Sequence, residues 1–310
     1  MADLESDPAP TKPPAEVRPP AEVRPPRPSR RRRISRWRLP VQMAFLGVWF
    51  AGALEFKFRW IKARWLPACV FQCHGCAWSA LACPIGIAAN FATLHAVPFL
   101  TIGIVVLTGA LMGSLVCGWA CPFGLLQDLL GKIPTPKFRI PDWMGYGRYL
   151  VLAGLVIVLP FVLGSYQTSF DDQAVSICRL CPAGAVEAAV PNAIRHRGSG
   201  GDFLGMSYTK LAVLGVFLVL VLFTYRPWCT IFCPLGGTLS LFNRLSLFHL
   251  RFNADKCVSC NLCRSYCSYG VKVDQSINNT RCIRCLECTT CGAVSPVLAP
   301  GRKTRNPKAA

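Results

Sequence analysis

Eighteen cysteines dominate the chemistry available to this 310-residue chain, and eight of them lie within 35 residues near the C-terminus. Two residues between ligands let one tight loop aim successive thiolates at one cubane, with the fourth ligand coming from farther along the chain. The array therefore predicts two [4Fe-4S] clusters. Its cysteines are Cys257, Cys260, Cys263 and Cys267, followed by Cys282, Cys285, Cys288 and Cys291.

The pairing of ligands within this array has two solutions. In the usual two-cluster pattern, Cys291 completes the first cluster and Cys267 completes the second. Only two residues separate Cys288 from Cys291, where three are usual, so each half closing its own cluster is the alternative. Zinc knuckles rarely present a third cysteine at this spacing, and disulfides are disfavoured in a basic segment that faces the cytosol.

A second pattern occupies the other ten cysteines. The tetrad Cys-Pro-x-Gly occurs four times, beginning at Cys83, Cys121, Cys181 and Cys233. Each has another cysteine upstream, and two follow the spacing Cys-x3-Cys-Pro. Along the chain, a motif predicted on the outer side of the membrane is followed by one predicted on the cytosolic side, and this order then repeats. The repeat indicates an internal duplication. An inner set is predicted to converge at the cytosolic ends of two spans: Cys117, Cys121, Cys229 and Cys233.

The outer cysteines are expected to converge at the opposite membrane face. Four converging thiols suit a further iron–sulfur cluster, a soft metal such as copper(I) or zinc, or dithiol–disulfide cycling. As an alternative, all ten of these cysteines are simply small buried apolar residues at helix ends. For the outer cysteines, a structural disulfide is a further alternative. That set comprises Cys69, Cys73, Cys76, Cys83, Cys178 and Cys181.

The composition predicts that hydrophobic helices position these thiols. Hydrophobic residues form 52% of the chain and charged residues only 16%, which is low for a soluble domain. No Asp, Glu, Lys or Arg occurs from Trp65 to Gln127, as expected for a membrane bundle. An uncharged stretch at Cys76–Leu94 is a candidate fifth span or re-entrant helix. Four spans are predicted, at about 39–58, 97–116, 149–164 and 208–225.

The charge distribution orients these spans. The net charge is +19, but its basic residues cluster at the two ends of the chain rather than on one face, which argues against nucleic-acid binding. Segments 1–38, 117–148 and 226–310 hold 26 of the 34 Lys and Arg residues. By the positive-inside rule these segments face the cytosol. The sequence thus predicts a multi-pass protein of the bacterial inner membrane with both termini cytosolic.

Four regions follow from this pattern. Residues 1–38 form a Pro- and Arg-rich tail predicted to be disordered, and residues 296–310 form a second, basic tail. Residues 39–250 form the membrane domain and residues 251–295 the ferredoxin region. The predicted fold class is an α-helical membrane protein, a four-span or five-span duplicated bundle, with a C-terminal α+β two-cluster ferredoxin-like domain.

The combination resembles the NapH type of membrane ferredoxin, and the NosR and MauN types look similar. The resemblance rests on the Arg-rich N-terminus, the two Cys-x3-Cys-Pro motifs and the eight-cysteine array, and it covers about residues 39–291. It implies electron transfer between a quinone or cytosolic donor and a partner redox enzyme, as a component rather than a stand-alone enzyme. A metal-handling or maturation factor, in which membrane thiols bind copper, is the alternative function.

Overall fold

The computed structural model describes residues 37–49, 67–71, 73, 81–166, 175–190, 208–254, 257, 261–290 and 292–298. Most of the two predicted tails lies outside the described residues. So do three of the predicted site cysteines, Cys76, Cys260 and Cys291, and the second half of the first predicted span.

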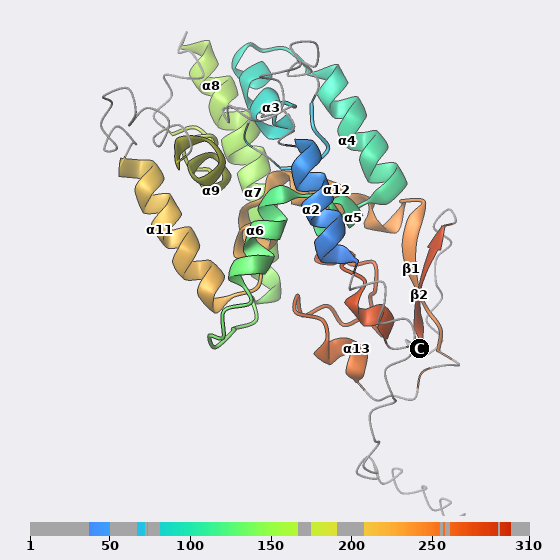
Figure 1. Ribbon diagram of the computed structural model, residues 1–310. Coiled ribbons are helices and arrows are strands. Elements are labelled where there is room, and N and C mark those ends of the chain that lie inside the picture. The colour runs from blue at the N-terminus through green and yellow to red at the C-terminus, as the bar shows by residue number, and fades with distance from the viewer. Residues whose placement is uncertain are drawn as a thin grey trace, which may run out of the picture.

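Helices make up most of the described chain (Figure 1). Their bounds in the first half are α2 (Arg38–Trp49), α3 (Pro84–Thr93), α4 (Phe99–Met112), α5 (Leu115–Trp119) and α6 (Pro122–Leu130), then the 3-10 helix η3 (Asp142–Tyr146), α7 (Gly147–Val151), the π-helix η4 (Leu152–Val158) and α8 (Leu159–Ser165).

The second half of the membrane region repeats part of this order. Its elements are α9 (Pro182–Gly184), the π-helix η5 (Ala185–Ala189), α11 (Tyr208–Phe223), the π-helix η7 (Trp228–Phe232), α12 (Pro234–Leu241) and the 3-10 helix η8 (Phe242–Arg244). Helix α12 packs against α4 and α7, and α3 packs against α8.

One helical run among the described residues, Asp142–Ser165, is long and apolar enough to cross a bilayer. The sequence predicted a shorter third span at 149–164, with Pro160 inside it. The π-helix before α8 shifts the hydrogen-bond register, so that Pro160 falls in the first turn of α8, where its missing N–H is not needed. Helices α4 and α11 match the second and fourth predicted spans but are shorter.

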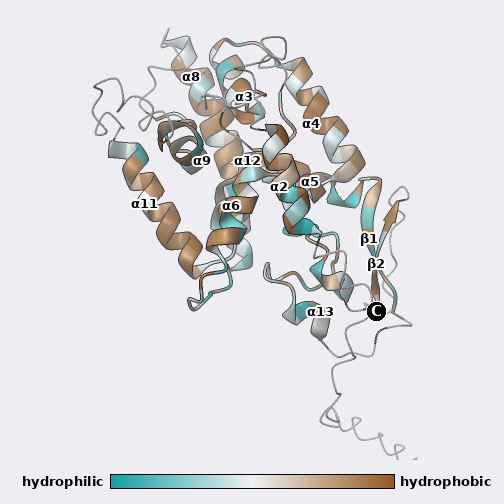
Figure 2. Cartoon of the chain, in the orientation of Figure 1, coloured by the Kyte–Doolittle hydropathy of each residue, from teal (hydrophilic) through white to brown (hydrophobic). Residues whose placement is uncertain are grey.

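Hydrophobic residues predominate along these helices (Figure 2), and many of their large apolar side chains are exposed. Phe99 is 79% exposed, Leu150 76% and Tyr208 81%. A continuous apolar surface of this kind is typical of contact with lipid or a partner. It supports the membrane prediction, while the four-span arrangement and the side on which each terminus lies stay predictions. Helix α3 has ten residues, too few to cross a bilayer alone.

The C-terminal region is built around a two-stranded antiparallel sheet, β1 (Phe248–Phe252) with β2 (Val294–Leu298). The strands enclose the cysteine array between them, together with α13 (Leu262–Ser265) and the 3-10 helix η9 (Glu287–Thr290). β1 begins before residue 251 and β2 extends beyond residue 295, so the folded region is slightly longer than the sequence predicted. Similarly, α2 begins at Arg38, inside the predicted tail.

Arg284 joins the C-terminal region to the membrane helices. Its side chain is fully buried, and its guanidinium donates to the carbonyls of Met112 at 2.9 Å and Asn243 at 2.6 Å. Trp119 Nε1 donates in turn to the Arg284 carbonyl at 3.1 Å. Gly118 allows this approach, since a Cβ there would lie 2.6 Å from the carbonyl oxygen of Ile283. The two regions are therefore packed together tightly at this point.

Candidate iron–sulfur sites

Each of the four Cys-Pro-x-Gly motifs begins a helix. The cysteine is the N-cap in an extended conformation, and the proline takes the first helical position, where no N–H is needed. The four helix starts are Cys83–Pro84 in α3, Cys121–Pro122 in α6, Cys181–Pro182 in α9 and Cys233–Pro234 in α12.

The glycine three residues after each cysteine has a steric role. At Gly124, Gly184 and Gly236, a Cβ would lie 3.1 to 3.5 Å from the carbonyl oxygen of the upstream cysteine of the same motif. The Gly236 N–H also donates to the Cys233 thiol sulfur at 3.3 Å, so the thiol caps its own helix. The motif thus fixes two thiols relative to each other by backbone contacts alone.

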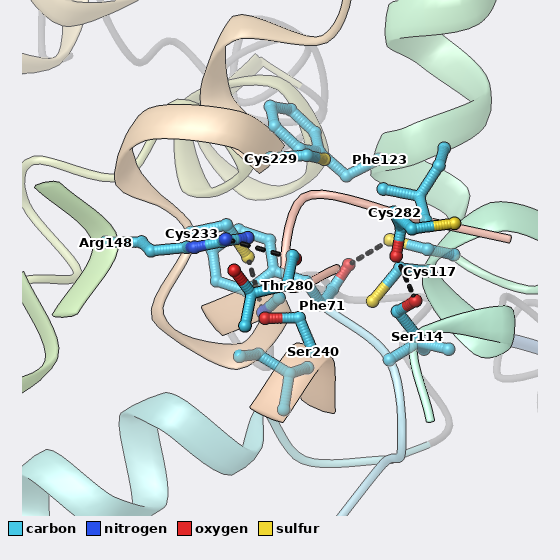
Figure 3. A pocket seen from close by; sticks show the side chains of 15 residues that line it. Phe71, Ser114, Cys117, Phe123, Arg148, Cys229, Cys233, Ser240, Thr280 and Cys282 are labelled. Carbon is cyan, nitrogen blue, oxygen red and sulfur yellow. Dashed lines mark hydrogen bonds between the residues drawn. The ribbon is translucent and has the colours of Figure 1, made fainter. Parts of the chain in front are cut away.

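The four inner thiols line one cavity (Figure 3). Cys117 lies in α5 and Cys121 caps α6, while Cys229 lies in η7 and Cys233 caps α12. Each half of the duplicated region therefore contributes two thiols to the wall. A fifth cysteine of the same wall, Cys282, comes from the C-terminal array.

Two buried arginines surround these thiols. Arg148 lines the cavity and is 4% exposed; its Nη2 donates to the Thr280 carbonyl at 3.1 Å, whereas its buried Nε has no partner. Arg226, also buried, donates to the Cys117 carbonyl at 2.8 Å. Buried cations are costly unless negative charge is close by. The charge of Arg226 is met by Asp128, whereas Arg148 has no carboxylate partner among the described residues, so the cavity suits an anionic centre beside Arg148.

Burial keeps the inner thiols protonated when nothing is bound to them. It raises the pKa of Cys121 to about 12, and neighbouring Cys229 contributes in the same direction. It also raises the pKa of Cys229, which the Arg226 charge partly offsets. A metal or cluster bound by these thiols would hold them as thiolates. Among the described residues, no three His, Cys, Asp or Glu side chains close around a single metal ion.

The outer cysteines that the structure describes do not form a separate group at an opposite face. Cys83 belongs to the same hydrophobic core as Cys121 and Cys233, with Cys69, Cys178 and Cys181 packed against it. The segment between Cys69 and Cys73 runs beside the inner cavity, and the Cys121 thiol contacts the Phe71 carbonyl at 3.6 Å. The chain folds inward there because Ala68, Val70 and Phe71 are all buried apolar residues.

The described array cysteines gather in the C-terminal core. Cys263 and Cys288 are buried in it, and Cys267 and Cys282 pack against it. Cys285 packs against a neighbouring apolar cluster with Cys267 and Cys282. Cys257 is half-buried. Whether Cys291 closes the first cluster or the second stays a prediction, because Cys260 and Cys291 lie outside the described residues.

Sequence reasoning missed the charged and amide side chains around the inner site. Asp128 accepts hydrogen bonds from Arg226 Nε at 2.7 Å and Arg38 Nη2 at 2.6 Å. Gln127 Nε2 contacts the Cys229 thiol at 3.1 Å. A signal existed, since Asp128 is the first acidic residue after a long uncharged stretch and Arg226 ends the last predicted span.

A family model described as a 4Fe-4S binding domain matches the chain twice, over residues 93–141 and 207–253. The first match contains Cys117 and Cys121, and the second contains Cys229 and Cys233. The two matches begin 114 residues apart, close to the 112 residues between Cys121 and Cys233. The match of one model to both halves supports the internal duplication. The outer cysteines lie outside both matches, and so does the C-terminal array.

Three relatives illustrate the similarity. An uncharacterized protein of Methanocaldococcus jannaschii, MJ0750, is 32% identical over 60% of this chain and 71% of its own length. The putative electron transport protein YccM of Escherichia coli is 26% identical over 67% of this chain and 56% of its own. The methylamine utilization ferredoxin-type protein MauN of Methylorubrum extorquens is 26% identical over 64% of this chain and 60% of its own.

The chain therefore spans less than two thirds of the length of YccM and of MauN. No solved structure matches it.

Proposed function

The chain belongs to the NapH, NosR and MauN type of polyferredoxin, and from this premise we propose that it is a membrane-anchored protein that passes electrons through at least three iron–sulfur clusters. Two [4Fe-4S] clusters would be held by the eight array cysteines. A third would be held by Cys117, Cys121, Cys229 and Cys233. An iron–sulfur cluster supplies one-electron chemistry whose potential depends on nearby charge, hydrogen bonds and solvent.

The shared wall between the array and the inner cavity carries this proposal. Cys282, a predicted array ligand, lines the inner cavity with the four membrane thiols. Its carbonyl accepts hydrogen bonds from Ser114 Oγ at 2.5 Å and from Asn243 Nδ2 at 2.8 Å, which hold the array loop against the membrane helices. A cluster on the array and one on the inner thiols would be neighbours in a rigid frame.

The chain's own residues fit an anionic cluster at the inner site. The four thiols supply the soft ligands that iron–sulfur clusters need. Arg148 and Arg226 supply positive charge where a thiolate-ligated cluster carries negative charge. Their burial excludes water that would otherwise screen this attraction.

We place the quinone, one of two proposed donors, in a pocket of about 370 Å³ between α2, α6 and the array. Arg38, Asp128 and Glu287 line its polar side, and Leu39, Leu129 and Tyr225 line its apolar side. Gln127 connects the pocket to the inner site, because it lines the pocket and also contacts Cys229. Its buried Oε1 has no hydrogen-bond partner and could accept one from a quinol hydroxyl.

Anaerobic purification followed by iron analysis and EPR tests the proposal. We expect about twelve iron atoms per chain if three cubanes are bound, and more if the protein holds a further cluster. Cys117→Ser with Cys229→Ser should remove about four of them and leave the array signals intact. If the unmodified protein instead holds stoichiometric copper or zinc, and the variant loses that metal but no iron, the third cluster is overturned. That result would favour the metal-handling alternative.

The donor is tested separately on the same preparation. A soluble short-chain quinol should reduce the clusters of the oxidised protein, and Gln127→Leu should slow this reduction without changing the iron content. Equal rates in Gln127→Leu and in the unmodified protein would exclude the pocket as the quinone site. A cytosolic donor would then be the remaining proposal.

A further inference from the structure

A second set of four cysteines converges beside the inner site: Cys73, Cys83, Cys178 and Cys181. We infer that these four hold a further iron–sulfur cluster, so that the membrane region carries two clusters side by side. The inference concerns different residues from those of the proposed function, although both rest on the internal duplication.

Gly184 lies against three of these four cysteines. A Cβ on Gly184 would lie 3.4 Å from the Cys178 carbonyl oxygen, 3.8 Å from the Cys73 sulfur and 3.9 Å from the Cys181 Cβ. These contacts join a segment near residue 73 to one near residue 180, more than 100 residues away in the chain. Cys83 completes the group, since it is buried in the hydrophobic core against which Cys178 and Cys181 pack.

The backbone of Cys73 is held in place by a buried carboxylate. Glu187 Oε2 accepts a hydrogen bond from the Cys73 N–H at 2.7 Å, and the Glu187 side chain is 8% exposed. Buried side-chain acceptors that fix a ligand's backbone are typical of constructed sites. Cys73 is therefore positioned by an element of the other half of the molecule.

The helix starts of the outer set reproduce those of the inner set, although two residues separate Cys178 from Cys181 and nine separate Cys73 from Cys83, instead of three. Cys83 and Cys181 cap their helices with φ,ψ of −71°,120° and −90°,117°, and Cys121 does so with −75°,119°. In both sets, each half contributes two thiols. Since a family model for 4Fe-4S binding matches the regions of the inner set, the same ligand type and construction favour the same class of cofactor in the outer set.

The two sets are separated by a short, well-packed segment. The Phe71 carbonyl accepts from the Cys121 thiol of the inner set, and Cys73 of the outer set follows two residues later. The Phe71 ring packs against Phe123 and Trp228, with centroid separations of 6.0 and 6.2 Å. Electrons arriving at the inner cluster would therefore have a second acceptor next to them.

Iron analysis of a double variant tests this inference. Cys178→Ser with Cys181→Ser should lose about four iron atoms per chain for a [4Fe-4S] cluster, or about two for a [2Fe-2S] cluster. The EPR signals of the array should be unchanged. Cys69→Ser is the matched control, since Cys69 packs against the same core but is not one of the four proposed ligands, and it should keep all its iron. Unchanged iron in the double variant overturns the inference.

A measurement on the unmodified protein covers the case in which the double variant fails to fold. Anaerobic alkylation followed by peptide mass mapping should leave Cys178 and Cys181 unlabelled until the iron is removed with a chelator, after which both should be labelled. Labelling before chelation, or recovery of a disulfide-linked peptide containing either residue, overturns the inference. If Cys178→Ser with Cys181→Ser loses iron but Cys117→Ser with Cys229→Ser does not, the inner cluster of the proposed function is disproved and the outer cluster stands.

Discussion

The array and the inner site present their cysteines in opposite ways. The array cysteines that the structure describes sit on loops and on two four-residue helices, and two of them, Cys263 and Cys288, are themselves part of the small hydrophobic core. Two of the inner thiols, Cys121 and Cys233, are fixed at the starts of α6 and α12, and the other two lie in α5 and η7. The comparison indicates that a cofactor would hold the array together, whereas helices hold the inner site.

Iron depletion should give the largest effect. Without clusters, the array should lose its structure because cofactor binding supplies much of its folding free energy. We expect amide hydrogen exchange in residues 257–290 to rise at least about 100-fold, a loss of about 2.7 kcal/mol. Exchange in α6 and α12 should change little. Mass spectrometry of iron-replete and iron-depleted protein in detergent measures both regions in one experiment, and equal changes in both would contradict the comparison.

Asp128→Asn should give the next largest effect, a loss of stability around the inner site. The change leaves Arg226, whose side chain is 1% exposed, without its carboxylate partner. Removing one partner of a buried ion pair costs about 3–5 kcal/mol. Asp142→Asn is the matched control, because Asp142 pairs with Arg281 but is 85% exposed, and exposed pairs contribute about 0–1 kcal/mol. Thermal unfolding in detergent should separate the two variants clearly.

The same pair predicts a pH dependence. Burial alone would raise the pKa of Asp128, but Arg226 and Arg38 outweigh it and hold the pKa below its usual range. A carboxyl whose pKa is lowered by folding stabilises the protein above its unfolded-state pKa, about 3.9. That stabilisation is lost as the pH falls through the folded-state pKa. Stability below about pH 4 should therefore fall less steeply in Asp128→Asn; parallel pH profiles would contradict this.

Gly118→Ala should give the smallest effect, confined to the boundary between the two regions. The new Cβ would lie 2.6 Å from the Ile283 carbonyl oxygen, so the array loop must shift. Overpacking of this kind costs about 1–3 kcal/mol. Gly103→Ala in α4 has no atom within 4 Å of its Cβ and should be neutral or slightly stabilising. The EPR spectrum of the cluster near Cys282 should change in Gly118→Ala only.

The features that depend on neighbouring residues could be predicted from the sequence. The spacing of the array, the four Cys-Pro-x-Gly motifs and the helices at the second, third and fourth predicted spans could all be found from the sequence. A proline after the cysteine ends hydrogen-bonded structure there, and the glycine permits either a tight turn or a helix start; the structure shows a helix start at each motif.

Contacts between residues that are far apart in the chain could not be predicted from the sequence. Nothing in the order of residues indicates that Phe71 returns to the inner cavity, which is why the outer cysteines were expected at the opposite face. Arg148 and Arg226 resemble ordinary cytosolic charges of a positive-inside pattern, and their burial depends on tertiary contacts with Thr280 and Asp128. The predicted third span, 149–164, begins seven residues after the start of the helical run Asp142–Ser165, and those seven residues include the charged Asp142 and Arg148.

The equal contribution of the two halves to both membrane thiol sites has a consequence for assembly. Each half of the molecule contributes two thiols to each proposed site and completes neither, so a chain with one half would need a second copy, related by a twofold axis, to close them. Covalent fusion of the halves replaces that association with an intramolecular one and lets the two copies diverge. The present chain accordingly carries Glu187 beside one site and Asp128 beside the other, an asymmetry that a symmetric pair of identical chains could not have.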